Sequence, residues 1–240
     1  MAEGVFSLTV GARLAVPLPA DNTGGASPAP TAATPPLQPW RLPVRGLAVF
    51  HGAGNVARLS HYFLPRLLLE GKRVVFLDGA NSADPRLLER FARERHVPFA
   101  DFNRGIQIAR AFTCFQLTEL IARIPKFLAD FPAQVVIVTA FPDLYFDEDV
   151  RDWNARVAFE QGLANLHRWC HVAIAVFSAM QDFAPPPARR QFFLKLCAAA
   201  NEVWRFSLDA DNRLKLIGER GLPSPGPALR VHPLPRGEGR

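Results

Sequence analysis

Three features are absent from this chain of 240 residues, and each absence excludes a class of protein. No apolar run reaches the roughly 18 residues that a membrane-spanning helix needs, so we expect no membrane segment. Cysteine is scarce, and the three cysteines lie far apart with no CxxC pair or nearby histidine pattern. They are expected to be small buried side chains in a reducing cytosol, not disulfides or metal ligands. Glu3 lies where a secretory signal would carry cations, which favours a cytoplasmic protein.

Lysine is also scarce, because the 28 basic residues include only four lysines. The formal net charge of +6 permits contact with a polyanion such as nucleic acid. A GC-rich coding bias would produce the same excess of arginine. Charge alone therefore does not identify a nucleic-acid partner.

Composition divides the chain into four segments. Residues 1–16 contain a short candidate strand around positions 6–10, and residues 17–43 are rich in proline, alanine, threonine and glycine. The second segment buries too little apolar surface to fold, so we expect a linker. Residues 44–233 are expected to form one α/β domain, and residues 234–240 a basic tail. With 49% hydrophobic residues, the chain can bury one sizeable core.

Buried strands alternate with amphipathic helices in this domain. Strands are expected at 47–50, 74–77, 135–138 and 172–177, and helices at 84–95, 113–130 (with a kink or an early end at Pro125) and 152–169. Segments 202–208 and 213–219 are expected to form a closing antiparallel hairpin. The pattern predicts an α/β fold with a mostly parallel sheet flanked by helices. Ligands of such sheets bind beyond the carboxyl ends of the strands, which here are the turns after Phe50, Asp78, Thr139 and Phe177.

The first of these turns has the layout of a phosphate-binding P-loop: an apolar strand, a glycine turn and a helix. Its candidate phosphate-contacting residues are Gly52, Ala53, Gly54, Asn55 and Arg58. Aligned to G-x-x-x-x-G-K-[ST], Arg58 replaces the lysine, and the next residue, a leucine, cannot ligate Mg²⁺. The alternative is a tight turn that needs glycine, with Arg58 in solvent.

The four turns, in this order, resemble the ATPase core of RecA/RadA-type recombinases and the related KaiC-like proteins. The most specific likeness is the run Ala109-Arg110-Ala111-Phe112 before a helix. VVIVTAFPDLYF resembles the Walker B strand of these proteins, and HVAIAVFSAMQ resembles their γ-phosphate-sensing strand. The likeness extends over residues 47–233 and implies a RecA-like P-loop NTPase fold.

The resemblance also implies where catalytic groups should lie, and the chain differs at each position. The water-activating glutamate aligns with Ala80, the Mg²⁺-orienting aspartate with Thr139, and the sensor glutamine with Met180, one residue before Gln181. Loss of such groups costs orders of magnitude in the rate of phosphoryl transfer. We therefore expect a pseudo-ATPase with no catalytic residue and no cofactor, to which ATP binds weakly at most. Asp78 is either a surrogate carboxylate or, as we favour, a cap of the turn that follows it.

The segment 182–190 aligns with a DNA-contacting loop of the recombinases. Phe183 is a candidate to stack on a base of single-stranded DNA, and Arg189 and Arg190 are candidates to neutralise phosphates. The alternative is a rigid proline-rich crossover into the next helix. The acidic segment 143–152 matches no calcium-binding pattern and is expected to be a solvated loop.

The leading hypothesis is a RecA-like accessory protein of DNA repair or recombination that binds DNA or a recombinase-type partner without turning over ATP. One alternative is an ATPase with an unorthodox P-loop, in which Arg58 and Asp78 take the missing roles. A second alternative is a protein-interaction module unrelated to DNA.

Overall fold

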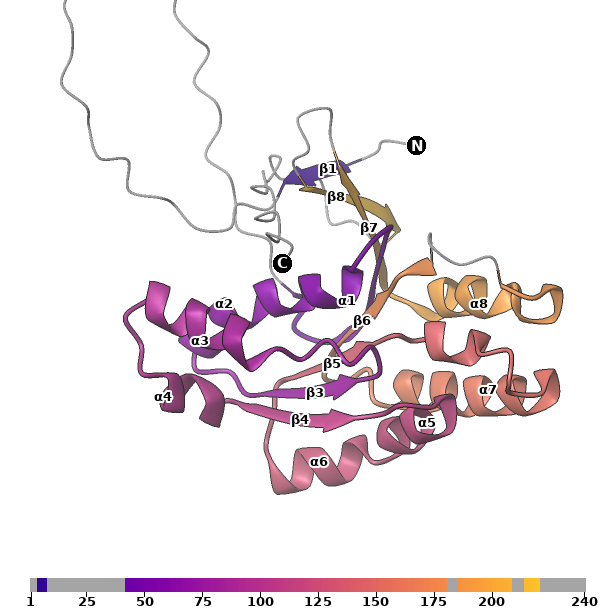
Figure 1. Cartoon of the computed structure of the whole chain (residues 1–240), viewed down its shortest axis with the longest axis horizontal. Coiled ribbons are helices and arrows are strands. Elements are labelled where there is room, and N and C mark those ends of the chain that lie inside the picture. Colours follow the sequence, from indigo (N-terminus) through magenta and orange to yellow (C-terminus); the bar gives the residue numbers. More distant parts are fainter. Residues whose placement is uncertain (1–3, 8–41, 181–184, 209–213, 221–240) are drawn as a thin grey trace, which may run out of the picture.

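The computed structural model describes residues 4–7, 42–180, 185–208 and 214–220, and they form a single eight-stranded sheet covered by helices (Figure 1). The order of the strands is β1-β8-β7-β2-β6-β5-β3-β4. Their bounds are Gly4–Ser7 (β1), Gly46–His51 (β2), Val74–Asp78 (β3), Ile106–Arg110 (β4), Val135–Thr139 (β5), Ala173–Ser178 (β6), Glu202–Leu208 (β7) and Leu214–Arg220 (β8). Strands β7, β2, β6, β5, β3 and β4 are parallel neighbours, whereas β8 and β1 pair antiparallel. The predicted parallel sheet and closing hairpin are confirmed.

Helices cover both faces of the sheet. The helical segments are Val56–Leu59 (α1), Ser60–Phe63 (η1), Leu64–Leu69 (α2), Pro85–Glu94 (α3), Phe99–Arg104 (α4), Cys114–Ala122 (α5), Ile124–Asp130 (α6), Asp143–Phe146 (η2), Asp152–Arg168 (α7), Pro187–Arg189 (η4) and Gln191–Ala199 (α8). One core cluster joins the sheet to α1, α2 and α3, and another joins the opposite face to α5, α6, α7 and α8. No helix among the described residues is long and apolar enough to cross a membrane.

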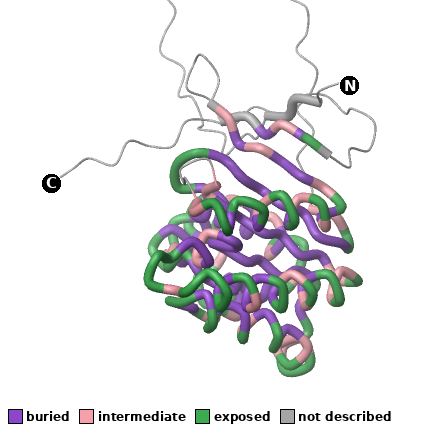
Figure 2. Tube along the Cα trace, turned by 90° about the vertical axis from the view of Figure 1, so that its right-hand side faces the viewer, coloured by how far each residue is buried: buried purple, intermediate pink, exposed green. Residues whose placement is uncertain are grey.

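The central strands are buried along their whole length, as parallel strands covered on both faces should be. Successive side chains of β2 alternate between the two layers. Leu47 and Val49 belong to the cluster with α5 to α8, and Ala48 and Phe50 belong to the cluster with α1 and α2. Figure 2 shows the buried strands between layers of exposed helix. The continuous apolar runs of the sequence are thus explained by burial on both sides.

Three segments can be compared in detail with the sequence predictions. Of the two outcomes expected at Pro125, a kink or an early end, the structure has the second: the helix ends at Ala122, and another begins at Ile124, since Pro125 fits only the first turn of a helix. Strand β4 was not predicted, because its burial alternates and it includes Gln107 and Arg110 in place of a continuous apolar run. Strand β1 overlaps the candidate strand of positions 6–10 at residues 6 and 7 and pairs with β8, whereas positions 8–10 lie outside the described residues. Of the linker predicted at 17–43, all but the last two residues lie outside the described residues, as does the tail predicted at 234–240.

Candidate functional site

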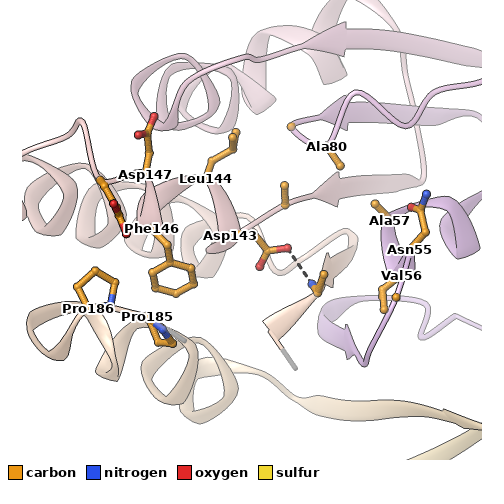
Figure 3. Close-up of a pocket in the computed structure, with 15 residues that line it drawn as sticks. Asn55, Val56, Ala57, Ala80, Asp143, Leu144, Phe146, Asp147, Pro185 and Pro186 are labelled. Carbon is orange, nitrogen blue, oxygen red and sulfur yellow. Dashed lines mark hydrogen bonds between the residues drawn. The ribbon is translucent and has the colours of Figure 1, made fainter. Parts of the chain in front are cut away.

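A cavity of about 810 Å³ lies at the carboxyl ends of the parallel strands (Figure 3). All four turns identified in the sequence contribute to its wall: residues 54–57 after β2, 79–80 after β3, 140–148 after β5, and 179 and 185–186 after β6. Parallel strands bring their carboxyl ends to one edge of a sheet, which explains why turns distant in sequence meet here. This cavity is the candidate ligand site.

The glycine turn after β2 is shaped by close packing. A Cβ atom at Gly52 would lie 2.9 Å from the carbonyl oxygen of Phe206, so β7 leaves no room for a side chain. Gly54 has a φ of 77°, which favours glycine, and the side chain of Asn55 accepts a hydrogen bond from the backbone N–H of Arg58. Of the five candidate phosphate-contacting residues, Gly54 and Asn55 line the cavity, whereas Gly52, Ala53 and Arg58 do not.

Arg58 is engaged on the outer side of this turn. Its guanidinium Nη2 lies 3.1 Å from Oδ2 of Asp84, and its side chain is 53% exposed. Asp84 is also the N-cap of α3, where its carboxylate accepts a hydrogen bond from Arg86 N–H at 3.0 Å. The cation that aligns with the P-loop lysine is therefore paired with a carboxylate outside the cavity.

Asp78 is fully buried and caps the turn after β3, as the second interpretation of this residue predicts. Its carboxylate accepts hydrogen bonds from the backbone N–H groups of Ser82 (2.9 Å) and Ala83 (2.8 Å). Thr139 Oγ1 donates a further bond to it at 3.1 Å and accepts one from Ala80 N–H at 3.2 Å. The residue at the metal-orienting position of the resemblance thus links β5 to the turn after β3.

The charged residues in the described wall of the cavity are all acidic. They are Asp143, Asp147 and Glu148, and the described wall includes no lysine, arginine or histidine. The carboxylate of Asp147, which is exposed, accepts a hydrogen bond from Asp149 N–H at 3.0 Å. Asp143 is held in place because its two oxygens accept hydrogen bonds from Ser178 Oγ (2.6 Å) and Ala179 N–H (2.8 Å). This environment repels phosphate groups.

Arg189 is not exposed, which corrects the prediction that it contacts DNA. It is 2% exposed, and its guanidinium donates hydrogen bonds to the carboxylate of Asp152 (2.7 Å) and the carbonyl oxygens of Tyr145 (3.0 Å), Asp147 (2.7 Å) and Val150. These bonds fix the loop after β5 to the segment after β6. A buried guanidinium with these partners is not free to neutralise a phosphate. Arg190 is exposed, and Phe183 lies outside the described residues.

Two buried histidines near the glycine turn make contacts that the sequence did not predict. His51 Nε2 donates to Glu219 at 2.8 Å, and Arg205 Nε donates to the same carboxylate at 2.8 Å. Burial raises the pKa of Glu219, but these hydrogen bonds outweigh it and hold the pKa below its usual value. Burial lowers the pKa of His61, whose Nε2 accepts from Asp84 N–H at 3.2 Å. Both contacts join segments distant in sequence, so no local pattern signals them.

The described residues offer no strong metal site, since no three histidine, cysteine, aspartate or glutamate side chains lie together in an arrangement that could hold an ion. Cys114 is buried, and burial raises the pKa of its thiol, as expected for a packing residue. A scan against protein-family models gives no match, and a search of curated proteins gives none either. The function is therefore argued from the geometry of the site.

Proposed function

We propose that the chain is a RecA-like accessory protein of DNA repair or recombination, which binds a protein partner or DNA and does not turn over ATP. The absence of ATP turnover is proposed because the charged residues that line the cavity are acidic. Phosphoryl transfer requires cations that neutralise the charge of the phosphates, whereas the described wall contains three acidic residues and no basic one. The process itself is proposed from the resemblance of the sequence to the recombinases.

The unorthodox-ATPase alternative is less compatible with the contacts of its two key residues. Arg58 would have to leave Asp84 and turn into the cavity. Asp78 would have to give up the hydrogen bonds that cap its turn in order to orient a metal ion or a water molecule. Each change leaves a charged group without the partners that now stabilise it, which costs free energy.

Binding of a protein partner is supported by the open edge of the sheet at β4. Val74 N–H donates to the Gly105 carbonyl, and Ala111 N–H donates to the Asp78 carbonyl. Backbone polar groups of a strand alternate between its edges, so those of residues 106, 108 and 110 point away from β3. In the described part of the chain no strand pairs with this edge. An unpaired edge is a template for an added strand from a partner.

The side chains beside this edge include exposed apolar groups. Ile108 is 38% exposed, Phe115 49% and Phe112 65%. A contiguous patch of exposed apolar side chains often marks a surface that a partner covers, and we propose that these three residues contribute to one. The protein-interaction alternative that is unrelated to DNA uses this same surface, so identification of the partner would distinguish the two hypotheses.

Steady-state turnover and calorimetric titration with MgATP, each with and without single-stranded DNA, test the proposal directly. We expect turnover at the background rate and no saturable heat of binding. Turnover well above background that is abolished by Arg58→Ala would contradict the proposal and support the unorthodox P-loop. The variant Arg86→Ala is the matched control, because it removes an exposed arginine on the neighbouring helix α3.

A further inference from the structure

The cavity has the size and the mostly apolar wall of a small-molecule site. Its volume of about 810 Å³ lies in the range of roughly 300–1,000 Å³ found for ligand pockets. Val56 and Phe146 contribute buried apolar surface, and Pro185 and Pro186 form part of the rim (Figure 3). A ligand that occupied this space would need an apolar portion.

The charged residues in the described part of the wall all have the same sign. Asp143 has a fixed position because Ser178 and Ala179 donate to its two oxygens. The backbone of Asp147 is fixed as well, since its carbonyl oxygen accepts from the buried guanidinium of Arg189 at 2.7 Å. Glu148 is exposed beside them. Asp143 and the backbone of Asp147 therefore have fixed positions before a ligand arrives, which reduces the entropy lost on binding. The exposed side chain of Asp147 accepts from Asp149 N–H at 3.0 Å.

We infer that this cavity binds an organic cation, namely a guanidinium or ammonium group on an apolar stem. The carboxylates would accept charge-assisted hydrogen bonds from the cationic group, and the apolar wall would contact the stem. The cation comes either from a free small molecule or from an arginine or lysine side chain of a bound protein. This inference goes beyond the proposed function and does not depend on the resemblance to recombinases.

Nuclear magnetic resonance titration of the full chain tests the inference with matched probes. The probe is n-butylguanidinium, and n-butylurea is its uncharged analogue of similar shape. We expect saturable shifts of the backbone amides of Gly79, Ala80 and Ala179, with the urea binding about tenfold more weakly because it lacks the charge. Equal affinities for the two probes, or shifts confined to amides outside the cavity, would overturn the inference. So would the absence of saturable shifts.

Variants identify the side chains that bind the cation. The double variant Asp147→Asn with Glu148→Gln removes two charges and retains side chains of the same shape, so the fold should persist. It should bind n-butylguanidinium about tenfold more weakly, and Glu119→Gln, an exposed acid on α5, should bind as the unaltered protein does. An unchanged affinity of the double variant, or an equal loss in Glu119→Gln, would contradict the assignment.

A third titration distinguishes the sources of the cation. The probe is the tripeptide Gly-Arg-Gly with both ends blocked, which presents the same guanidinium on a protein backbone. Tighter binding of the peptide than of n-butylguanidinium would identify the side chain of a partner as the ligand. Exclusion of the peptide, with the free cation still bound, would identify a small molecule. Binding of MgATP with shifts at the same amides would overturn the inference for both sources, and would contradict the proposed function as well.

Discussion

Thr139 Oγ1 donates a hydrogen bond to Oδ1 of Asp78 at 3.1 Å, which joins the carboxyl ends of β5 and β3 beside the cavity. Both side chains are fully buried. The hydroxyl also accepts from Ala80 N–H, so one side chain stabilises the buried carboxylate and the turn that follows it. An aspartate at position 139 would instead bring a second carboxylate to this point, where two like charges repel.

Replacement of Thr139 by valine should therefore destabilise the fold. The variant keeps the shape of the side chain but leaves a buried carboxylate with one donor fewer, at a cost of roughly 1–3 kcal/mol. Thr139→Ser retains the hydroxyl and should lose less. Urea denaturation followed by circular dichroism measures both, and equal stabilities of the two variants would show that the hydroxyl has no role.

Arg189 should be required for stability, not for binding. Arg189→Met removes the donor from three backbone carbonyl groups and from Asp152, so we expect a loss of about 3 kcal/mol or more in the free energy of unfolding. Arg189→Lys should not restore stability, because an ammonium cannot reproduce the planar array of donors. Arg190→Met, at the exposed neighbour, should change stability by less than about 0.5 kcal/mol. Thermal denaturation compares the three variants.

Any contact of the segment 182–190 with DNA phosphates should depend on Arg190. Each phosphate neutralised contributes roughly −0.7 to the slope of log affinity against log salt concentration on single strands, so Arg190→Ala should flatten that slope by about 0.7. Phe183→Ala should weaken binding with little change of slope, since stacking releases no counterions. Fluorescence anisotropy at several salt concentrations provides the slopes. An Arg190→Ala variant with an unaltered slope would exclude this segment as the contact.

His61 should make the fold less stable in mild acid. Burial lowers the pKa of its imidazole below 6.5, so below pH 6.5 the unfolded chain binds a proton that the folded protein does not. The contribution of neutral His61 to the free energy of unfolding is complete above pH 6.5. It is lost as the pH falls from there through the pKa that His61 has in the folded protein. Urea denaturation between pH 7.5 and 5 should show this loss, and His61→Gln should reduce it. His167→Gln, at an exposed histidine, is the matched control for the substitution itself.

Backbone amides along β4 should exchange with solvent in an alternating pattern. The N–H groups of residues 107 and 109 point toward β3 and should be protected, whereas those of 106, 108 and 110 face the open edge and should exchange quickly. Hydrogen exchange detected by nuclear magnetic resonance measures each amide separately. Uniform protection along the strand would mean that the edge is already paired, for example with a second copy of the chain.

The central part of the fold could be predicted because strands buried on both faces have a simple sequence pattern. The strands that became β2, β3, β5 and β6 are continuous apolar runs, and parallel pairing then brings the turns after them to one edge. Strand β4 has no such run, since one of its edges is unpaired and its burial alternates. The sequence predicts where the cavity lies, but the local pattern carries little information about its charge.

The contacts that define the site could not be predicted, because they join residues that lie far apart in the sequence. Arg189 follows a proline-rich segment and looks like an exposed cation, yet its acceptors are carbonyl groups 39–44 residues earlier in the chain. His51 and Glu219 are separated by 168 residues. Such partners are determined by how the loops fold over the sheet. Local periodicity and motif spacing do not contain this information.

The carboxylate lining of the cavity also restricts how its ligand could change during evolution. A first basic substitution in the wall would form an ion pair with Asp143 or Glu148 and bring little affinity for an anion. Loss of one carboxylate would leave two others to repel an anionic ligand. The effect of each substitution thus depends on the others, which is epistasis in the strict sense. Among relatives of this chain, we expect the acidic residues at 143, 147 and 148 to be retained or lost as a set.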